Sequence, residues 1–192
     1  MTLDEIIDKI ERQYAPLSED CKSELIKVAK PLMVPKNTIL VKEGQYSNKA
    51  FFIVKGCARA FYLKDGKDIT DWFAFENDFI SSINSFFSNM PSPHYIEVLE
   101  DAFLIELKRE DIDRLSDQFH DFERLNKVII TKTMLQQQER IVSLQFQSSR
   151  QRYARLIEIY PNITQRVLLS HIASYIGITL ETLSRIRRPN LT

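Results

Sequence analysis

Residues 168–188 read LLSHIASYIGITLETLSRIRR, and this spacing is typical of a helix-turn-helix, two short helices joined by a tight turn. Ala173 is small enough to let the two helices approach, and Gly177, four residues later, permits the turn. Ile178 and Leu183 are spaced to bury the underside of the second helix. The sequence therefore predicts a helix-turn-helix within this segment.

The predicted second helix begins after Thr179, whose hydroxyl can cap it. Its exposed side would present Leu180, Glu181, Ser184, Arg185 and Arg188. Such groups suit DNA, because arginine donates two hydrogen bonds to guanine, glutamate accepts from cytosine N4, and hydroxyls reach phosphate. The alternative is a small helical bundle in which Gly177 ends one helix and the arginines are solvated.

The charge of the chain is divided unevenly. Its 26 basic and 26 acidic residues give a formal net charge of zero, which excludes a chain-wide basic coat for nucleic acid or membranes. From Glu139 onward, eight arginines and three acidic residues give a net charge of +5, so residues 1–138 carry −5. A basic segment that contains the helix-turn-helix, attached to an acidic remainder, favours DNA binding at one end of the molecule.

Residues 111–147 contain neither glycine nor proline, and they predict a short helix that leads into a long one. Apolar residues of the long helix recur at 3/4 spacing on one stripe and every seven residues on another. These are Phe122, Leu125 and Ile129 on the first stripe and Val128, Leu135 and Val142 on the second. A stripe of the second kind favours a helix partner, so we expect a homodimer; the alternative is a core helix of the same monomer.

Short β-branched and aromatic runs, separated by glycine turns, follow two predicted helices at residues 3–14 and 18–30. Asp65-Gly66 is a hairpin signal between two of these runs. Short strands with a turn about every ten residues predict a closed antiparallel roll or jelly roll. The predicted strands are residues 38–41, 50–54, 58–63, 69–75 and 95–107, and helices are predicted at 149–159, 167–175 and 179–187.

The composition argues against most enzyme and membrane classes. The three histidines, His94, His120 and His171, are too far apart for the usual zinc and non-haem iron motifs, and common nucleotide and hydrolase motifs do not occur. No apolar run approaches the roughly 20 residues of a membrane helix. Cys21 and Cys57, without a leader-like start, indicate a reducing compartment. We therefore expect a cytoplasmic protein with no catalytic or metal-binding residues.

Four short motifs follow one another in an order that fits these parts. They are Lys42-Glu43-Gly44, residues 50–56 (AFFIVKG), residues 77–80 (NDFI) and, most specifically, residues 181–185 (ETLSR). With these motifs, about residues 30–188 resemble the Crp/Fnr family of bacterial transcription regulators. The resemblance implies an α+β fold: an N-terminal antiparallel β-roll (a double-stranded β-helix or jelly roll), a long dimerisation helix and a C-terminal winged helix-turn-helix.

The resemblance also implies a domain organisation and roles for individual residues. It implies a cyclic-nucleotide-binding-like sensor domain over residues 1–115, a dimerisation helix over 116–147 and a DNA-binding domain over 148–192. Glu181 and Arg185 would read bases, whereas Thr179 and Thr182 would contact the DNA backbone. The implied DNA-binding residues are Thr179, Leu180, Glu181, Thr182, Ser184, Arg185 and Arg188. The implied partners are double-stranded DNA, a second copy bound through residues 119–144, and RNA polymerase.

Two features depart from the family pattern. Leu180 stands where relatives often place a polar or basic residue, and an apolar side chain reaches at most a thymine methyl group. This argues against the best-known DNA half-site of the family. Only residues 161–166 separate the preceding helix from the helix-turn-helix, so the expected wing is short.

Cyclic AMP binding in the manner of the family is not expected. Members that bind it use a Gly-Glu pair for the ribose and an Arg-Ser pair for the phosphate, because a buried phosphate needs a cation and backbone amides. The equivalent places here read Ser81-Ser82 and, roughly, His94-Tyr95, and no arginine lies within residues 60–108. Two cysteines are also too few for the iron–sulfur cluster of other members. The identity of an effector or cofactor stays open.

A polar and aromatic set in the predicted roll is compatible with a different small effector. Its polar lining would be Ser81, Ser82, Ser85, His94 and Tyr95, and its apolar walls would be Trp72, Phe73, Phe86 and Phe87. The alternative is that these aromatic side chains are ordinary core and that His94 lies in a surface loop.

Two other functions are compatible with the same architecture. A roll of this type can hold a catalytic metal, but such sites need two or three clustered histidines and a carboxylate, and the predicted roll has His94 alone. A helix-turn-helix can also bind a protein in place of DNA. The sequence does not separate such a ligand-sensing dimeric module from a DNA-binding regulator.

Overall fold

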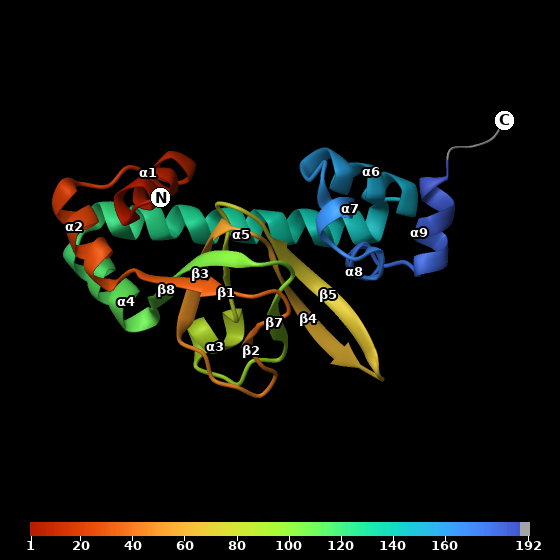
Figure 1. Ribbon diagram of the computed structural model, residues 1–192, viewed down its shortest axis with the longest axis horizontal. Coiled ribbons are helices and arrows are strands. Elements are labelled where there is room, and N and C mark those ends of the chain that lie inside the picture. The colour runs from red at the N-terminus through yellow and green to blue at the C-terminus, as the bar shows by residue number, and fades with distance from the viewer. Residues whose placement is uncertain (189–192) are drawn as a thin grey trace.

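The computed structural model describes residues 1–188, whose strands form two four-stranded antiparallel sheets (Figure 1). The strand order is β1-β8-β3-β6 in the first sheet and β2-β7-β4-β5 in the second. The strands are β1 (Lys30–Val34), β2 (Ile39–Val41), β3 (Lys49–Lys55), β4 (Ala58–Lys64), β5 (Lys67–Ala74), β6 (Phe79–Ser81), β7 (Tyr95–Val98) and β8 (Ala102–Lys108). These eight strands are named the β-roll.

Helices precede, interrupt and follow the β-roll. They are α1 (Leu3–Gln13), α2 (Glu19–Val28), α3 (Ile83–Ser88), α4 (Arg109–Gln118), α5 (His120–Phe146), α6 (Ser149–Ile159), α7 (Ile163–Arg166), α8 (Leu169–Tyr175) and α9 (Leu180–Arg187). The predicted α+β fold, with an antiparallel roll, a long helix and C-terminal helices, is confirmed. Within residues 1–188, no helix has the length and apolarity needed to cross a membrane.

Strand β3 shows why the first sheet needs cover on both faces. Phe51 and Ile53 point into the β-roll and join the core between the two sheets. Phe52 and Val54 join the core beneath the helices, because successive strand residues point to opposite faces. All four side chains are at most 4% exposed. Helices α1, α2, α4 and the first half of α5 therefore bury the outer face of this sheet.

Helix α5 presents two different surfaces along its 27 residues. Phe122 and Leu125, on the predicted buried stripe, are 3% and 2% exposed because they pack against the outer face of the first sheet. The second half of α5 extends past the β-roll to α6–α9 (Figure 1). From residue 130 onward, α5 exposes Ile130, Met134, Leu135, Ile141, Val142, Leu144 and Phe146. This half of the helix is not a core helix of the single chain.

The strand predicted over residues 95–107 is wrong as a single element, because it forms two strands in different sheets. β7 pairs with β2 and β4, whereas β8 pairs with β1 and β3. Two hydrogen bonds fix the crossing between them: the Leu99 N–H donates to the Cys57 carbonyl (2.9 Å), and the side-chain Oδ1 of Asp101 accepts from the Lys36 N–H (2.9 Å). Apolar side chains are buried on both sides of the crossing, and the acidic pair Glu100-Asp101 is the local signal that separates the two strands.

Four elements, β1, β6, α3 and α7, are not among the predicted ones, and the second helix is shorter than predicted. α2 ends at Val28, and Lys30 already pairs with Glu106 in β8. Pro31 obscures β1, because proline lacks a backbone donor; it is tolerated there because β1 is an edge strand. The predicted hairpin at Asp65-Gly66 is confirmed, since both residues have positive φ (52° and 71°), as a two-residue type I′ turn requires.

The C-terminal segment is entirely helical where the structure describes it. Helices α6, α8 and α9 lie within two residues of their predicted positions. α7 occupies the place where a short wing was expected, and residues 148–188 contain no strand. The wing is therefore not found among the described residues. Residues 189–192 of the expected DNA-binding domain lie outside them.

Gly56→Ala is expected to lower the free energy of unfolding by about 3 kcal/mol. Gly56 has φ +99°, and an added Cβ would lie 2.8 Å from the Ala102 Cβ, so backbone strain and overlap both act. Gly66→Ala is the matched control: φ is +71°, but no described atom lies within 4 Å of the added Cβ. Gly66→Ala should lower the free energy of unfolding by only about 1–2 kcal/mol, from backbone strain alone. Urea unfolding measures both, and equal losses would contradict the close approach of Gly56 to Ala102.

Candidate nucleic-acid interface and effector site

Helices α8 and α9 form the predicted helix-turn-helix. Gly177 has φ +69°, and the Ile178 N–H donates to the Ala173 carbonyl at 3.0 Å, which closes the turn. Ala173 and Leu183 are 2% and 0% exposed where the two helices pack together. The predicted N-cap is also confirmed, because the Thr179 hydroxyl accepts a hydrogen bond from the backbone N–H at the third position of the helix.

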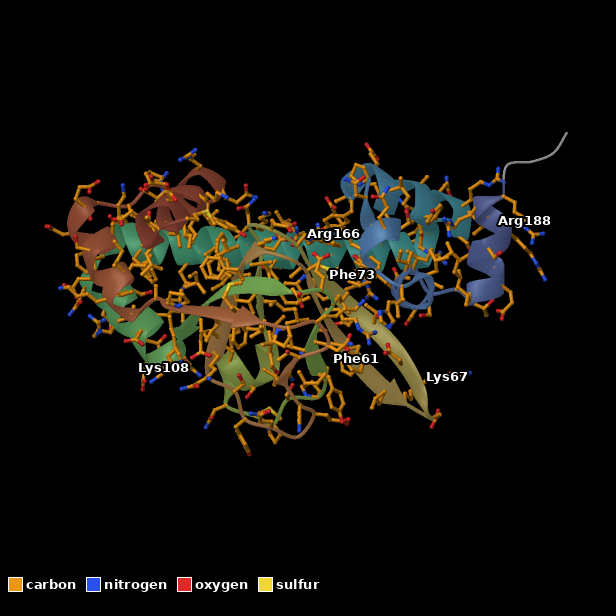
Figure 2. All side chains as sticks on the ribbon, viewed as in Figure 1. Phe61, Lys67, Phe73, Lys108, Arg166 and Arg188 are labelled. Atoms are coloured by element: carbon orange, nitrogen blue, oxygen red, sulfur yellow. The ribbon has the colours of Figure 1, made fainter. Side chains whose placement is uncertain are left out.

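One side of α9 is free for a partner. The side chains of Glu181, Ser184, Arg185 and Arg188 are exposed, whereas Leu183 on the opposite side is buried. Figure 2 shows Arg188 at the outer end of the molecule, away from the β-roll. Hydrogen bonds from its own N–H and from the Thr179 hydroxyl, together with the Arg185 charge, hold the pKa of Glu181 below its usual range. α9 therefore presents a carboxylate and guanidinium groups on one face.

The remaining predicted members of this surface differ in exposure. Leu180 is 45% exposed at the start of α9. Thr182 is half-buried, and its hydroxyl lies 3.2 Å from the Thr179 hydroxyl, so both threonines take part in the cap. The structure thus brings all seven predicted residues together on one short helix and its flanking residues, with Thr182 the least accessible.

Helix α8 is held against the free edge of the β-roll. The Ser174 hydroxyl accepts from the Thr70 N–H (2.8 Å) and donates to the Asp68 carbonyl (3.1 Å). Both backbone groups belong to β5, the edge strand of the second sheet. Arg140 of α5 adds a bond to the Tyr175 carbonyl (3.3 Å) and an ion pair with Asp71 (3.4 Å). These contacts set the orientation of the helix-turn-helix relative to the β-roll.

Arg166 makes a second connection between the C-terminal helices and the β-roll. Its guanidinium bonds both carboxylate oxygens of Glu76 (2.7 and 2.9 Å) and also contacts Glu100. It lies over the Phe75 ring, 5.2 Å from the centroid, and Figure 2 shows it beside the β-roll and α5. Arg166 therefore serves an internal contact. Because Arg166 is paired with Glu76 and Glu100, fewer positive charges of the C-terminal segment are available to a partner than its net charge of +5 suggests. The sequence alone does not reveal this pairing.

The five residues predicted for an effector do not line one cavity. Ser82, Ser85 and His94 are at most 4% exposed. The Ser82 hydroxyl donates to Ser92 Oγ (2.8 Å), which donates to the His94 carbonyl (2.7 Å). Ser85 Oγ accepts from the Ser47 N–H (2.6 Å). The serine hydroxyls are thus satisfied within the chain, whereas neither ring nitrogen of His94 has a hydrogen-bond partner among the described residues. The partners Ser47 and Ser92 were not predictable, because nothing in their spacing relates them to β6 and α3.

The other two predicted residues lie apart from this group. Tyr95 stacks on the Phe61 ring with centroids 5.1 Å apart. Ser81 lines a cavity of about 430 Å³ between the first sheet, α3 and α5. Of the predicted apolar walls, Trp72, Phe86 and Phe87 line the same cavity. Phe73 instead packs against Tyr175 of α8, with centroids 5.0 Å apart.

Comparison with known proteins relates this chain to one domain family and one fold. Residues 31–119 match the family described as "Cyclic nucleotide-binding domain". No curated protein sequence matches the chain at a significant level. FixK2 from Bradyrhizobium japonicum is a similar solved structure, with a TM-score of 0.73 and 18% identity over 83% of this chain and 82% of that chain.

Two further structures share the fold. A protein described as a transcriptional regulator of the Crp/Fnr family, from Eubacterium rectale, has a TM-score of 0.68 and 18% identity over 88% of this chain and 82% of its own. A CooA mutant from Carboxydothermus hydrogenoformans has a TM-score of 0.63 and 20% identity over 83% of this chain and 75% of its own. At these identities the likeness concerns the fold.

Stability is expected to fall as the pH is lowered below about 6.5, the unperturbed value for histidine. Burial lowers the pKa of His94 despite the opposing charge of Asp71, and burial together with Arg59 lowers the pKa of His171. Both imidazoles are favoured neutral in the folded chain, so the unfolded chain binds more protons and acid favours unfolding.

His94→Phe should make this pH dependence shallower, because it removes one of the two groups. His94 has no hydrogen-bond partner at either ring nitrogen within the described structure, and its ring packs edge-on against Tyr62, so an aromatic replacement fits. Urea unfolding at a series of pH values between 5 and 8 measures the slope. A variant with the slope of the unmodified protein would refute the role of His94.

Proposed function

Because the chain carries a cyclic nucleotide-binding domain within the fold of Crp/Fnr regulators, we propose that it is a dimeric transcription regulator that binds DNA and catalyses no reaction. It would act in the cytoplasm on double-stranded DNA, with RNA polymerase as a further partner. In this proposal, residues 1–115 are the sensor domain, residues 116–147 the dimerisation helix and residues 148–192 the DNA-binding domain.

The outward face of α9 is the observation that carries the DNA-binding proposal. Arg185 and Glu181 stand one turn apart on a capped helix whose opposite side is anchored by the buried Leu183. Arginine can contact guanine with two hydrogen bonds, and glutamate accepts from cytosine. A rigid helix presents both groups at a fixed spacing, which suits reading of base edges in the major groove. Thr179 lies at the helix start, where hydroxyls and backbone N–H groups reach phosphate.

The dimer proposal rests on the exposed half of α5, within residues 119–144. Ile130, Met134, Gln137, Ile141 and Leu144 follow the 4-3-4-3 spacing of a coiled-coil seam. The four apolar side chains among them are 37–60% exposed in the single chain. Burying them against a second α5 would remove this surface from water.

The stripe of Val128, Leu135 and Val142 lies on a neighbouring face of the same helix. Thr131 and Gln138 complete its heptad pattern, so two of its five positions are polar, against one of five on the Met134 stripe. We therefore assign the Met134 stripe as the centre of the seam and the Leu135 stripe as its flank.

Arg185→Ala is expected to weaken binding to a specific palindromic site by about 1–3 kcal/mol and to relax preference at one base pair. Arg187→Ala is the matched control on the same helix, because Arg187 lies toward the side of the buried Leu183. It should weaken binding to all sequences slightly and equally. Footprinting and titration at several salt concentrations measure both.

The outcome also separates DNA from a protein partner. No protected palindrome, with half-sites about one helical turn apart, would count against DNA binding. Equal effects of Arg185→Ala and Arg187→Ala on specificity would show that Arg185 does not read bases.

Met134→Glu is expected to dissociate the dimer, because it would bury a carboxylate in the seam without a partner. The dimer dissociation constant should rise by at least about tenfold, a cost of about 1.4 kcal/mol or more. Leu135→Glu, on the adjacent position and the flanking face, should have a clearly smaller effect. Sedimentation of the full chain measures the association. A monomeric unmodified protein, or a larger effect of Leu135→Glu, would refute this seam.

A further inference from the structure

The cavity of about 430 Å³ lies outside the β-roll, on the outer face of the first sheet. Ala50 and Leu107 line it and belong to the core beneath the helices, whereas Phe51, next to Ala50, points into the β-roll. The buried Ser82 and Ser92 pair does not line this cavity.

The floor of this cavity is buried in the single chain. Ile10, Leu25, Phe122 and Leu125 line it and are only 2–3% exposed. Protein interiors are normally packed without voids of this size. Pockets that hold small ligands span about 300–1,000 Å³, so the volume suits one small molecule.

The residues that line the cavity disfavour a charged ligand. Among the described residues that border the cavity, none is acidic, basic or histidine. Trp72, Phe86 and Phe87 supply aromatic surface, and Ser81 and Asn126 supply neutral polar groups. A phosphate or carboxylate would enter such a space without a compensating cation, at a large cost in lost hydration. An apolar molecule would gain dispersion contacts and displace little bound water.

We propose that this cavity binds an uncharged, predominantly apolar small molecule. Its assignment as the effector of the regulator rests on the proposed function. Helix α5 supplies the physical connection, because it lines the cavity from Phe122 to Gln137 and then holds α8 through Arg140 and Tyr175. A ligand in this cavity would therefore contact α5, the helix that is bonded to α8 of the helix-turn-helix.

The occupant is a small molecule and not the second copy of the chain. Ile130 and Met134, at the mouth, are 42% and 60% exposed and also belong to the proposed seam. A second α5 would close this mouth. The floor lies behind α5 against Ile10 of α1 and Leu25 of α2, so a neighbouring helix at the mouth leaves it empty.

Binding is tested on the full chain with N-phenyl-1-naphthylamine, an uncharged aromatic probe that fluoresces in apolar surroundings. We expect saturable binding of about one probe per chain, a higher thermal midpoint with the probe bound, and no displacement by cyclic AMP. Absence of saturable binding, or displacement by cyclic AMP, would overturn the proposal.

Two variants of α5 locate the probe. Thr133 lines the cavity, so Thr133→Trp should fill it and weaken probe binding by at least about tenfold. Glu139 is exposed on α5, borders neither the cavity nor the proposed seam, and is the matched control, so Glu139→Trp should change binding by less than about twofold. Ala50→Met fills the cavity from the sheet side and gives the same test if Thr133→Trp does not fold. Equal binding by the cavity-filling and control variants would place the probe on the exposed surface and refute the cavity site.

DNA binding by the same samples distinguishes failure of this inference from failure of the proposed function. A protein that binds DNA but not the probe refutes the cavity site and leaves the regulator proposal standing. A protein that binds the probe in the cavity but no DNA supports the ligand site and refutes its role as an effector site for DNA binding.

Discussion

Burial of both faces of the sheet β1-β8-β3-β6 is the constraint on which the rest of the molecule depends. The second sheet covers its inner face, where Phe51 and Ile53 lie, and helices must cover Phe52 and Val54 on its outer face. The first half of α5 provides much of that cover, which fixes the direction of the whole helix. Since a 27-residue helix is stiff, its second half is carried beyond the β-roll and delivers α6–α9 to β5. The placement of the helix-turn-helix thus follows from an apolar sheet face far from it in sequence.

Features that depend on local chemistry were predictable from the sequence. The turn at Gly177, the N-cap at Thr179 and the hairpin at Asp65-Gly66 each depend on the backbone conformation of only one or two residues. The structure confirms all three predictions. Features that depend on distant partners were not. Residues 95–107 form two strands because β7 and β8 find partners in different sheets. The predicted effector residues do not line one cavity, because the Ser82 hydroxyl and the His94 backbone bond to Ser92, a partner that no spacing rule connects to them. The cavity also depends on distant partners, since nine separate elements line it.

The division of charge along the chain has two components that only the structure separates. Arg140 and Arg166 hold the C-terminal helices to acidic groups of the β-roll, and Arg152 donates to the Ile176 carbonyl at 2.7 Å. Arg185 and Arg188 are exposed on the outward face of α9. The acidic character of the β-roll is therefore partly a docking surface for the C-terminal segment. Ion pairs of Arg140 and Arg166 with acidic residues join the β-roll to the C-terminal helices. The exposed arginines of α9 are left for a polyanion such as DNA.

The hydroxyl of Ser174 has a consequence for solubility. It forms hydrogen bonds with the outward N–H of Thr70 and the outward carbonyl of Asp68. An edge strand would otherwise offer these backbone groups for pairing with another extended chain. While α8 stays in place, these two groups of β5 are not available for strand addition. A fragment cut before α8 would carry this edge uncovered, with Phe73 beside it losing Tyr175, and would tend to self-associate by β-pairing. The helix-turn-helix segment thus protects the β-roll from aggregation, independently of any role in binding DNA.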